Sequence, residues 1–409
     1  MKNESDAECH GPISGVSVLD LSTVIAGPFA AALLGDLGAE VLKVELPLDA
    51  QGRGGDGLRQ LPPHKDGKPL IWKSTNRNKK AITLDLRREE GRELLLRLVS
   101  RFDVVVENFR PGTLDKWGIT KEALWNANRS LTILRVTGFG QTGPYRSYPG
   151  FARLFEAYSG LVGVTGDETP LHAGYPIGDP ISGTFGALGV VAALLRRAKH
   201  PEESGQEIDL SCTEAVMRLL EVLPVEYDQL GFNRKRIGND NAYSSPSGVF
   251  QTADGKWITL SAGTQSVFER LCELMGMEDL RLDDHFKDNS SRVANRVQLN
   301  AIVNLWISQQ PSHSLVQRLS EYGVSAAPIF SSQDIAEDPH FKVRGAIERI
   351  PDDDFGSVAV PCIVPRFSST PGRLRCAGPS LGAHNAEVYG KWLGLTPEEQ
   401  KMLAQKRII

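Results

Sequence analysis

Residues 15–45, GVSVLDLSTVIAGPFAAALLGDLGAEVLKVE, contain two short apolar runs on either side of a segment rich in alanine and leucine. The runs Val16–Leu21 and Glu40–Glu45 have the length and the aliphatic character of buried strands. The segment between them, Pro28–Leu37, begins with proline and is followed by Gly38, as is typical of a helix. A strand, a helix and a second strand in this order predict two parallel strands connected by a crossover helix.

The same alternation continues along the first half of the chain. Apolar runs typical of strands alternate with amphipathic stretches typical of helices, and loops separate them. This order predicts an α/β fold in which helices cover both faces of a parallel sheet. Further strands are expected at Ala81–Leu86, Val104–Phe109, Leu131–Thr137 and Glu207–Cys212, and helices at Glu89–Ser100, Phe151–Val162 and Ser182–Ala198.

The pattern changes at Pro224–Ser247, a stretch of Gly, Asn, Ser and Pro with little periodicity. Beyond it, Gly248–Thr252 and Lys256–Ser261 flank an Ala-Asp-Gly turn and predict a β-hairpin. We expect residues 1–11 to be a flexible N-terminus, residues 12–224 and 341–409 to form a large domain, and residues 225–340 to form a smaller α+β domain. Further helices are expected at Val267–Met275, Ser291–Ser308, Ser314–Tyr322 and Asn385–Lys406.

Composition favours a soluble cytoplasmic protein. The chain has 409 residues, 41% of them hydrophobic and 23% charged, and its formal net charge is −4. This charge gives no reason to expect nucleic acid or an anionic membrane as a partner. The five cysteines are scattered without a C-x-x-C pair, as is typical of reduced thiols. The uncharged stretch Pro180–Leu195 is short for a membrane span and suits a buried helix.

No motif indicates a metal site or an α/β-hydrolase. His64, His172 and His384 lack the spacing of metal ligands, and the chain contains no H-E-x-x-H. Its one G-x-S-x-G pattern, Gly378–Gly382, does not follow a predicted strand, so no nucleophile elbow is indicated. We therefore expect no metal.

Gly138-Phe-Gly-Gln-Thr-Gly143 spells G-x-G-x-x-G directly after a predicted strand. In a dinucleotide-binding fold this motif opens a helix whose N-terminus binds a pyrophosphate. Pro144 and Pro149 follow here and no helical period begins. We therefore expect a tight loop and no nicotinamide site.

Asp179 lies in Gly178-Asp-Pro-Ile-Ser-Gly183, directly before an apolar helix. Aspartate followed by proline is typical of an N-cap residue and the first position of a helix. The same place suits catalysis, because a helix N-terminus stabilises the carboxylate anion and lowers its pKa. An ionised carboxylate there can attack an activated acyl group. The residues alone leave both the cap and the nucleophile open.

Basic residues gather where the predicted strands begin and end. Asn76–Lys80 precedes a strand, Arg87–Arg88 follows it, and Glu107–Gly112 ends another. In a parallel sheet, ligands bind beyond the carboxyl ends of the strands. These groups suit either a phosphorylated cofactor or a solvated charged face.

Taken together, these stretches resemble the class III CoA-transferase family, the CaiB/BaiF group. Residues 15–45 are similar to its opening segment, and GYPIGDPISG (174–183) is similar to the segment that carries its catalytic aspartate. The resemblance runs nearly from end to end of the chain. It also includes NRNKKAITLDL (76–86), VENFRPGTLDKWGI (106–119), VTGFGQTGP (136–144), EYGVSAAPIFSSQDIAEDPHFKVRG (321–345) and PSLGAHNAEVYGKWLGL (379–395).

The resemblance implies a large Rossmann-like domain built from both chain ends, a small central domain and an interlocked-ring homodimer. It implies an enzyme that uses coenzyme A thioesters and carboxylic acids as substrates and has no permanently bound cofactor. Asp179 would attack the donor acyl-CoA and pass through an aspartyl anhydride and an aspartyl–CoA thioester, from which an acceptor acid takes the CoA. Succinyl-CoA or another dicarboxylyl-CoA is the expected donor.

The resemblance also assigns binding residues. An acyl and oxyanion pocket maps to Ile25 and Ala26, where the apolar Ile25 side chain leaves only backbone amides as donors. The loop Ser244–Gly248 is the nearest match to a loop that closes over the intermediate, which adds Gly248 to this pocket. The expected CoA contacts are Leu84, Arg87, Asn108, Phe109, Lys116, Thr137 and Gly138.

Two alternative functions are compatible with this fold. α-Methylacyl-CoA racemases need a base on each side of the α-carbon, and they carry a His-Asp pair after the glycine that matches Gly150. This chain has Phe151-Ala152 there, so one proton-transfer group is missing. A non-catalytic acyl-CoA-binding protein would not need the carboxylate of Asp179. We therefore expect a CoA-transferase.

Overall fold

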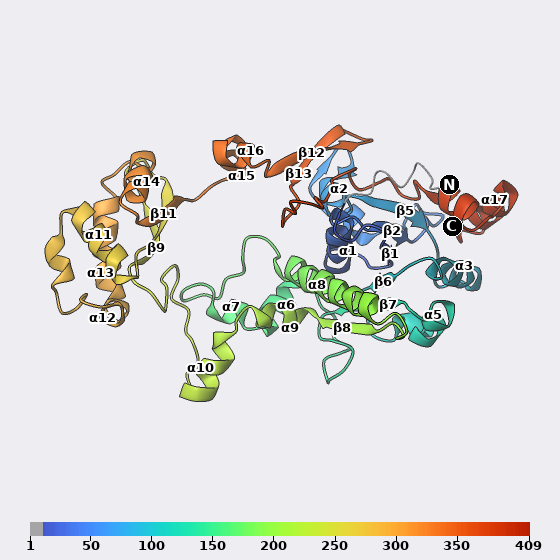
Figure 1. Cartoon of the computed structure of the whole chain (residues 1–409), viewed down its shortest axis with the longest axis horizontal. Helices are drawn as coiled ribbons and strands as arrows, with labels where there is room; N and C mark the ends of the chain where they lie inside the picture. The colour runs from blue at the N-terminus through green and yellow to red at the C-terminus, as the bar shows by residue number, and fades with distance from the viewer. Residues whose placement is uncertain (1–10) are drawn as a thin grey trace. The chain divides into compact units, whose positions relative to one another are not determined.

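The computed structural model describes residues 11–409, which form two compact units (Figure 1). Unit 1 contains segments from both ends of the chain, and unit 2 is formed mainly by one segment between them. Each unit has a hydrophobic core of its own. Unit 1 comprises the described residues up to Leu161, Ala173–Val225 and Gly345–Ile409, and unit 2 comprises Val162–His172 and Glu226–Arg344.

Unit 1 is built on a six-stranded sheet in which every neighbouring pair of strands is parallel. Numbered by their order along the chain, its strands lie in the sequence 3-2-1-4-5-6, which is a doubly wound order. The predicted α/β fold with a parallel sheet is therefore confirmed. From edge to edge the strands are β5 (Lys79–Thr83), β2 (Glu40–Glu45), β1 (Ser17–Asp20), β6 (Val104–Glu107), β7 (Thr132–Thr137) and β8 (Glu207–Ser211).

Helices cover both faces of this sheet. Successive residues of β1 enter different cores, because side chains alternate across a strand: Val18 packs in one cluster and Leu19 in the other. On the Val18 face lie α1 (Ala26–Asp36), α6 (Ala152–Tyr158), α8 (Gly178–Lys199) and α9 (Cys212–Arg218); on the Leu19 face lie α3 (Glu89–Val99), α5 (Lys121–Ala127) and the π-helical segment Ala386–Trp392.

The C-terminal segment attaches to the edge strand β5. The Asn385 side chain bonds the backbone amide and the hydroxyl of Thr83 at 2.9 and 2.8 Å, and the Tyr389 hydroxyl donates to the Thr83 carbonyl at 2.5 Å. The remaining elements of unit 1 are η2 (Gly57–Gln60), β3 (His64–Lys65), β4 (Lys68–Pro69), α2 (Leu70–Thr75), α4 (Thr113–Lys116), β12 (Ile347–Asp352), β13 (Gly356–Pro361) and α17 (Pro397–Gln405).

Unit 2 contains a three-stranded antiparallel sheet. β9 (Ser247–Gln251) and β10 (Trp257–Ser261) form the hairpin predicted from the sequence, and β11 (Ser325–Pro328) pairs with β10. The single helix predicted at Ser291–Ser308 is wrong, because the chain breaks at Asn295 into two helices. The helices of this unit are α11 (Gln265–Met275), η3 (Glu278–Arg281), α12 (Asn289–Ala294), α13 (Arg296–Ile307), α14 (Ser312–Glu321), α15 (Ser332–Glu337) and α16 (Pro339–Val343), and α7 (Leu161–Val164) and α10 (Val222–Leu230) lie where the chain passes between the units.

Candidate active site

The strand order reverses between β1 and β6, and a side chain bridges the loops that follow these two strands. Asn108, directly after β6, accepts a hydrogen bond from the Thr23 amide and donates one to the Thr23 carbonyl, both at 2.7 Å. In doubly wound sheets the ligand crevice lies at this reversal, beyond the carboxyl ends of the strands. The expected CoA-binding residue Asn108 therefore lies at the position where this fold provides a binding crevice.

A pocket of about 290 Å³ opens at the same edge of the sheet. It includes three of the expected CoA contacts, Leu84, Arg87 and Phe109. The Arg87 guanidinium makes two hydrogen bonds of 2.8 Å to the Asp85 carboxylate, which fixes one cation at the rim of a largely apolar pocket. The other lining residues are Leu21, Thr23, Val44, Glu45, Leu46, Gly55, Asp56, Asp85, Leu86 and Trp117.

The other four expected CoA contacts, Asn108 among them, do not line this pocket. Lys116 is exposed on α4, next to the lining residue Trp117. Thr137 and Gly138 lie at the end of β7, where the Gly138 carbonyl accepts a hydrogen bond of 2.8 Å from the Thr213 hydroxyl. A Cβ on Gly138 would lie 2.7 Å from the ring of Phe155, so glycine is required by packing. No helix begins until Ala152, so the glycine motif forms a loop as expected.

Asp179 is the second residue of α8 and does not cap it. The helix begins at Gly178, Ile177 occupies the N-cap position, and no side-chain cap hydrogen bond is present. The N-cap interpretation is therefore wrong, since the helical conformation starts one residue before Asp179. Instead, the half-buried carboxylate has no hydrogen-bond donor among residues 11–409.

α8 approaches α1 closely through two glycines. A Cβ on Gly183 would lie 2.8 Å from the carbonyl oxygen of Ala26, and one on Gly186 would lie 3.4 Å from the Cβ of Ala30. These contacts show that the two helices run in the same direction. Asp179 lies one turn before Gly183 on the same face of α8, which places it beside the N-terminus of α1.

The loop from β1 to α1 leaves three successive amides without an acceptor. Within residues 11–409, nothing accepts a hydrogen bond from the amides of Ile25, Ala26 or Gly27. Val24, just before them, has φ 67°, a conformation that strains a β-branched residue by about 1–3 kcal/mol. Its amide donates to Asp56 Oδ1 at 2.9 Å. This bond holds the loop in the conformation that leaves the three amides at the helix N-terminus unpaired.

Two buried ion pairs support this loop. Lys43 pairs with Asp56 at 3.0 Å and Lys79 with Asp20 at 2.9 Å, and all four side chains are fully buried. Lys43 also donates to the Ser22 carbonyl, and burial lowers the pKa of Lys79 to about 8. Lys79 belongs to the basic segment Asn76–Lys80, which the sequence assigned either to a phosphorylated cofactor or to a solvated face; both interpretations are wrong for Lys79, because it is buried and paired. Lys43, Asp56 and Asp20 were not singled out from the sequence, although a lysine inside an apolar strand run is a signal for a buried pair.

The pKa of Asp179 is shifted in the opposite direction to the one expected from the sequence. Burial, followed by the negative charge of Glu156, raises the pKa of Asp179 to about 6. The expected lowering by the helix N-terminus is therefore wrong, because loss of hydration and a like charge outweigh the dipole. Glu156, on α6, is fully buried and accepts a hydrogen bond from the Gly178 amide at 3.2 Å. It was not singled out from the sequence.

Residues 13–385 match the sequence model of CoA-transferase family III. The chain belongs to this family. The resemblance inferred from the sequence is confirmed, and the protein is a class III CoA-transferase.

Relatives with named activities cover nearly the whole chain. It is 41% identical to the succinyl-CoA–D-citramalate CoA-transferase of Chloroflexus aurantiacus, over 97% of this chain and 98% of that protein. It is 34% identical to the succinate–glutarate CoA-transferase of Agrobacterium fabrum, over 93% and 95%. A CaiB/BaiF family protein from Brucella suis has a similar structure, with a TM-score of 0.81, 33% identity and coverage of 93% and 99%.

One residue assigned to the acyl pocket of this class III CoA-transferase lies in unit 2. Gly248 is buried in β9, opposite Leu260 of β10, and the ring of Phe250 lies 3.3 Å from the place of its Cβ. Its approach to Asp179 stays a prediction.

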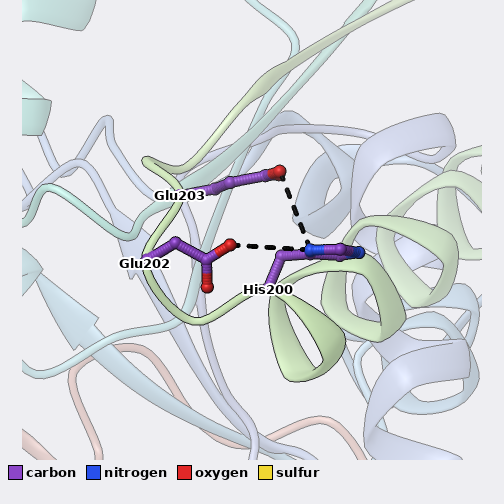
Figure 2. A group of neighbouring side chains, drawn as sticks. All are labelled: His200, Glu202 and Glu203. Atoms are coloured by element: carbon purple, nitrogen blue, oxygen red, sulfur yellow. Dashed lines mark ion pairs between the residues drawn. The ribbon is translucent and has the colours of Figure 1, made fainter.

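Figure 2 shows a group within residues 11–409 that has the spacing of metal ligands. His200 Nδ1 lies 3.5 Å from a Glu202 carboxylate oxygen and 4.0 Å from one of Glu203. The Arg196 guanidinium already binds the Glu203 carboxylate, with Nε at 2.9 Å. The group follows the last turn of α8, about 30 Å from Asp179 by the rise of a 22-residue helix. It is not part of the site.

α8 is also long and apolar enough, by length and composition alone, to cross a membrane. Its contacts indicate a core helix instead, because Gly183, Gly186 and Val190 are buried against the sheet and α1. The helix expected in this stretch is confirmed, but it is buried on one side only, because Leu188 and Leu195 are exposed.

Proposed function

We propose that this class III CoA-transferase moves CoA from succinyl-CoA, or another dicarboxylyl-CoA, to a free carboxylic acid, with Asp179 as the nucleophile. The observation that carries the proposal is the half-buried carboxylate of Asp179, which has no hydrogen-bond donor and lies beside the unpaired amides at the N-terminus of α1. A carboxylate without hydrogen bonds keeps its electron pairs available for attack on an activated acyl group.

The proposed reaction needs neither a metal nor ATP. The Asp179 carboxylate attacks the thioester carbonyl of the donor, the C–S bond breaks, and a mixed anhydride and CoA thiolate form. The thiolate attacks the aspartyl carbonyl, which releases the donor acid and leaves an aspartyl–CoA thioester. The acceptor carboxylate attacks this thioester to give a second anhydride and thiolate. The thiolate then attacks the acceptor carbonyl, which releases the new acyl-CoA and restores Asp179.

Each step passes through a tetrahedral oxyanion that needs fixed donors. The unpaired amides of Ile25, Ala26 and Gly27 are the donors we propose, because they are held at a helix N-terminus by the Val24 amide bond to Asp56. Backbone donors suit this role, since their positions do not depend on a rotamer. They also agree with the apolar side chain at Ile25.

We propose that unit 1 is a Rossmann-like CoA-binding domain and that unit 2 is the small domain that carries Gly248. The pocket with Leu84, Arg87 and Phe109 would take the nucleotide, because it combines apolar walls with one cation. Asn108, Lys116, Thr137 and Gly138 would meet the phosphates and pantetheine.

The choice of donor rests on the relatives. Two of them, from Chloroflexus aurantiacus and Agrobacterium fabrum, are named for succinyl-CoA or succinate. A racemase is less well supported here, because Phe151 and Ala152 provide no group for proton transfer.

We further propose a cytoplasmic homodimer without nucleic acid or membrane partners. The outer face of α8 exposes Leu188 by 62% and Leu195 by 56%, and Met217 of α9 and Leu219 directly after α9 are exposed by 44% and 58%. The two exposed leucines on one side of α8 in particular favour a covered surface.

Intact-protein mass spectrometry after mixing with a panel of acyl-CoAs tests the proposal. A CoA or acyl adduct that hydroxylamine removes, and that is absent from Asp179→Ala but present in the surface control Asp353→Asn, is expected. The donor that gives the adduct names the substrate class. Absence of any adduct, with α-hydrogen exchange into deuterated water, would favour the racemase.

A further inference from the structure

Glu156 is a fully buried carboxylate beside the proposed nucleophile, and the reaction steps give it no part. It lies on α6, and its Oε1 accepts the Gly178 amide at 3.2 Å, one residue before Asp179. A Cβ on Gly178 would lie 3.1 Å from the Ala152 carbonyl oxygen of α6 and 3.4 Å from the Glu156 Cγ, so the tighter contact is with the α6 backbone. The other oxygen, Oε2, lies 3.6 Å from Arg153 Nη1. Glu156 therefore fixes the start of α8 and places a charge next to it.

We propose that Glu156 is a positioning residue that destabilises the free Asp179 carboxylate relative to its neutral anhydride and CoA-thioester forms. This inference rests on the proposed function, since it requires Asp179 to be the nucleophile. Two carboxylates that share a poorly hydrated site repel each other. When Asp179 is acylated or carries CoA, its charge is gone and the repulsion ends. Glu156 thus favours formation of each covalent intermediate while its hydrogen bond holds the segment in place.

After burial, Glu156 is the one charged group in the described part of the chain that raises the pKa of Asp179. α1 has no acidic group in its first turn and no basic group in its last turn. On α9, burial raises the pKa of Cys212 to about 12, which keeps the thiol neutral. Arg153 faces Glu156 from the same helix, but its side chain is 43% exposed and the same Nη1 also donates to the Ala173 carbonyl at 2.7 Å. Arg153 therefore screens the Glu156 charge only weakly.

Consistent with this geometry, the pKa of Asp179 is raised to about 6, and Glu156 is the charge that contributes. Protonation and acylation both neutralise Asp179, so the same repulsion favours both. Removing the Glu156 charge should therefore lower the pKa of Asp179 and, by a similar factor, the equilibrium population of the covalent intermediate.

The Glu156→Gln variant separates charge from packing, because glutamine retains an oxygen that can accept the Gly178 amide. We expect the acidic limb of the kcat/KM profile, which reports the free enzyme, to move down by about one pH unit. At a fixed ratio of succinyl-CoA to succinate near neutral pH, the ratio of CoA-adduct to free enzyme should fall by about tenfold in intact-mass spectra. Arg153→Gln should move both quantities in the opposite direction.

The comparison with Glu156→Ala distinguishes a purely structural role. This variant loses the charge and the acceptor, so it should show the same shift of the acidic limb together with a lower kcat. If folded Glu156→Gln leaves the acidic limb of the kcat/KM profile and the ratio of CoA-adduct to free enzyme unchanged, the inference is overturned. The proposed function would still stand in that case, provided that the native enzyme forms the adduct on Asp179. If native enzyme forms no adduct, or Asp179→Ala retains it, both are overturned.

Discussion

Replacing Asp179 with asparagine should stabilise the folded protein while it removes the proposed nucleophile. The carboxyl has an ordinary pKa of 3.8, and burial and Glu156 raise it to about 6 in the folded chain. The folded chain therefore binds this proton more tightly than the unfolded chain. The stability that the protonated group contributes is complete below pH 3.8 and is lost as the pH rises through about 6.

The size of the effect follows from this shift. About two pKa units correspond to about 3 kcal/mol, which is the cost of keeping Asp179 ionised in the folded protein above pH 7. At about pH 5 the cost is roughly half as large, because the folded carboxyl is then mostly protonated. Asparagine has a similar shape, is neutral at every pH, and loses no hydrogen bond, since the carboxylate accepts none within residues 11–409.

Urea unfolding of Asp179→Asn and native protein at about pH 7.5 and about pH 5 measures this difference. Tryptophan fluorescence follows unfolding through four tryptophans of unit 1 and two of unit 2, which are Trp72, Trp117, Trp125, Trp392, Trp257 and Trp306. The gain in stability should be larger at the higher pH, and exposed Asp353→Asn should change neither value. A loss of stability, or a gain that is the same at both pH values, would refute the assignment of a strained, ionised carboxylate at this position.

Three other variants test separate parts of the site. Asn108→Ala removes two hydrogen bonds to Thr23, so it should cost about 1–3 kcal/mol in urea unfolding and lower kcat; an unchanged kcat would speak against a role for this loop. Arg87→Ala should raise KM for succinyl-CoA by about tenfold and leave KM for a succinyl-pantetheine thioester unchanged, whereas equal effects would rule out a nucleotide contact. Leu188→Lys should give monomers in light scattering, and a dimer as stable as the native one would exclude this face of α8 as the interface.

The bounds of a strand in unit 1 could be predicted from the local sequence where the strand is a mainly apolar run. β2 occupies the predicted residues Glu40–Glu45. β5 was predicted at Ala81–Leu86 and lies at Lys79–Thr83, because the charged Lys79 is buried by pairing with Asp20. In unit 2, the helix expected through Asn295 breaks because the Asn295 side chain donates to the Ser291 carbonyl at 2.9 Å and competes with the backbone.

The candidate site was predictable only in part, because contacts between residues distant in sequence determine the rest. The motifs of this family point to Asp179, Arg87 and Phe109 through their order along the chain. The partners of Asp179 depend on tertiary packing, since Glu156 comes from another helix and is buried by the segment it bonds. The same holds for Asp56, which reaches the Val24 amide from a loop with no regular pattern.

Two electrostatic effects of opposite sign act on the Asp179 carboxylate, and their balance suits the proposed chemistry. The first turn of α8 and the N-terminus of α1 favour an anion, while burial and Glu156 disfavour it, and the outcome is a pKa of about 6. A lower pKa would give a carboxylate too stable to form an anhydride readily, and a higher one would leave it protonated near neutral pH. In the proposed mechanism the amides of α1 keep a function when Asp179 is neutralised, because they would then donate to the oxyanion of the next step. If the proposed mechanism holds, the glycine contacts that bring α8 against α1 serve the reaction as well as the fold, since a side chain at Gly183 would meet the Ala26 carbonyl oxygen at 2.8 Å and push the two helices apart.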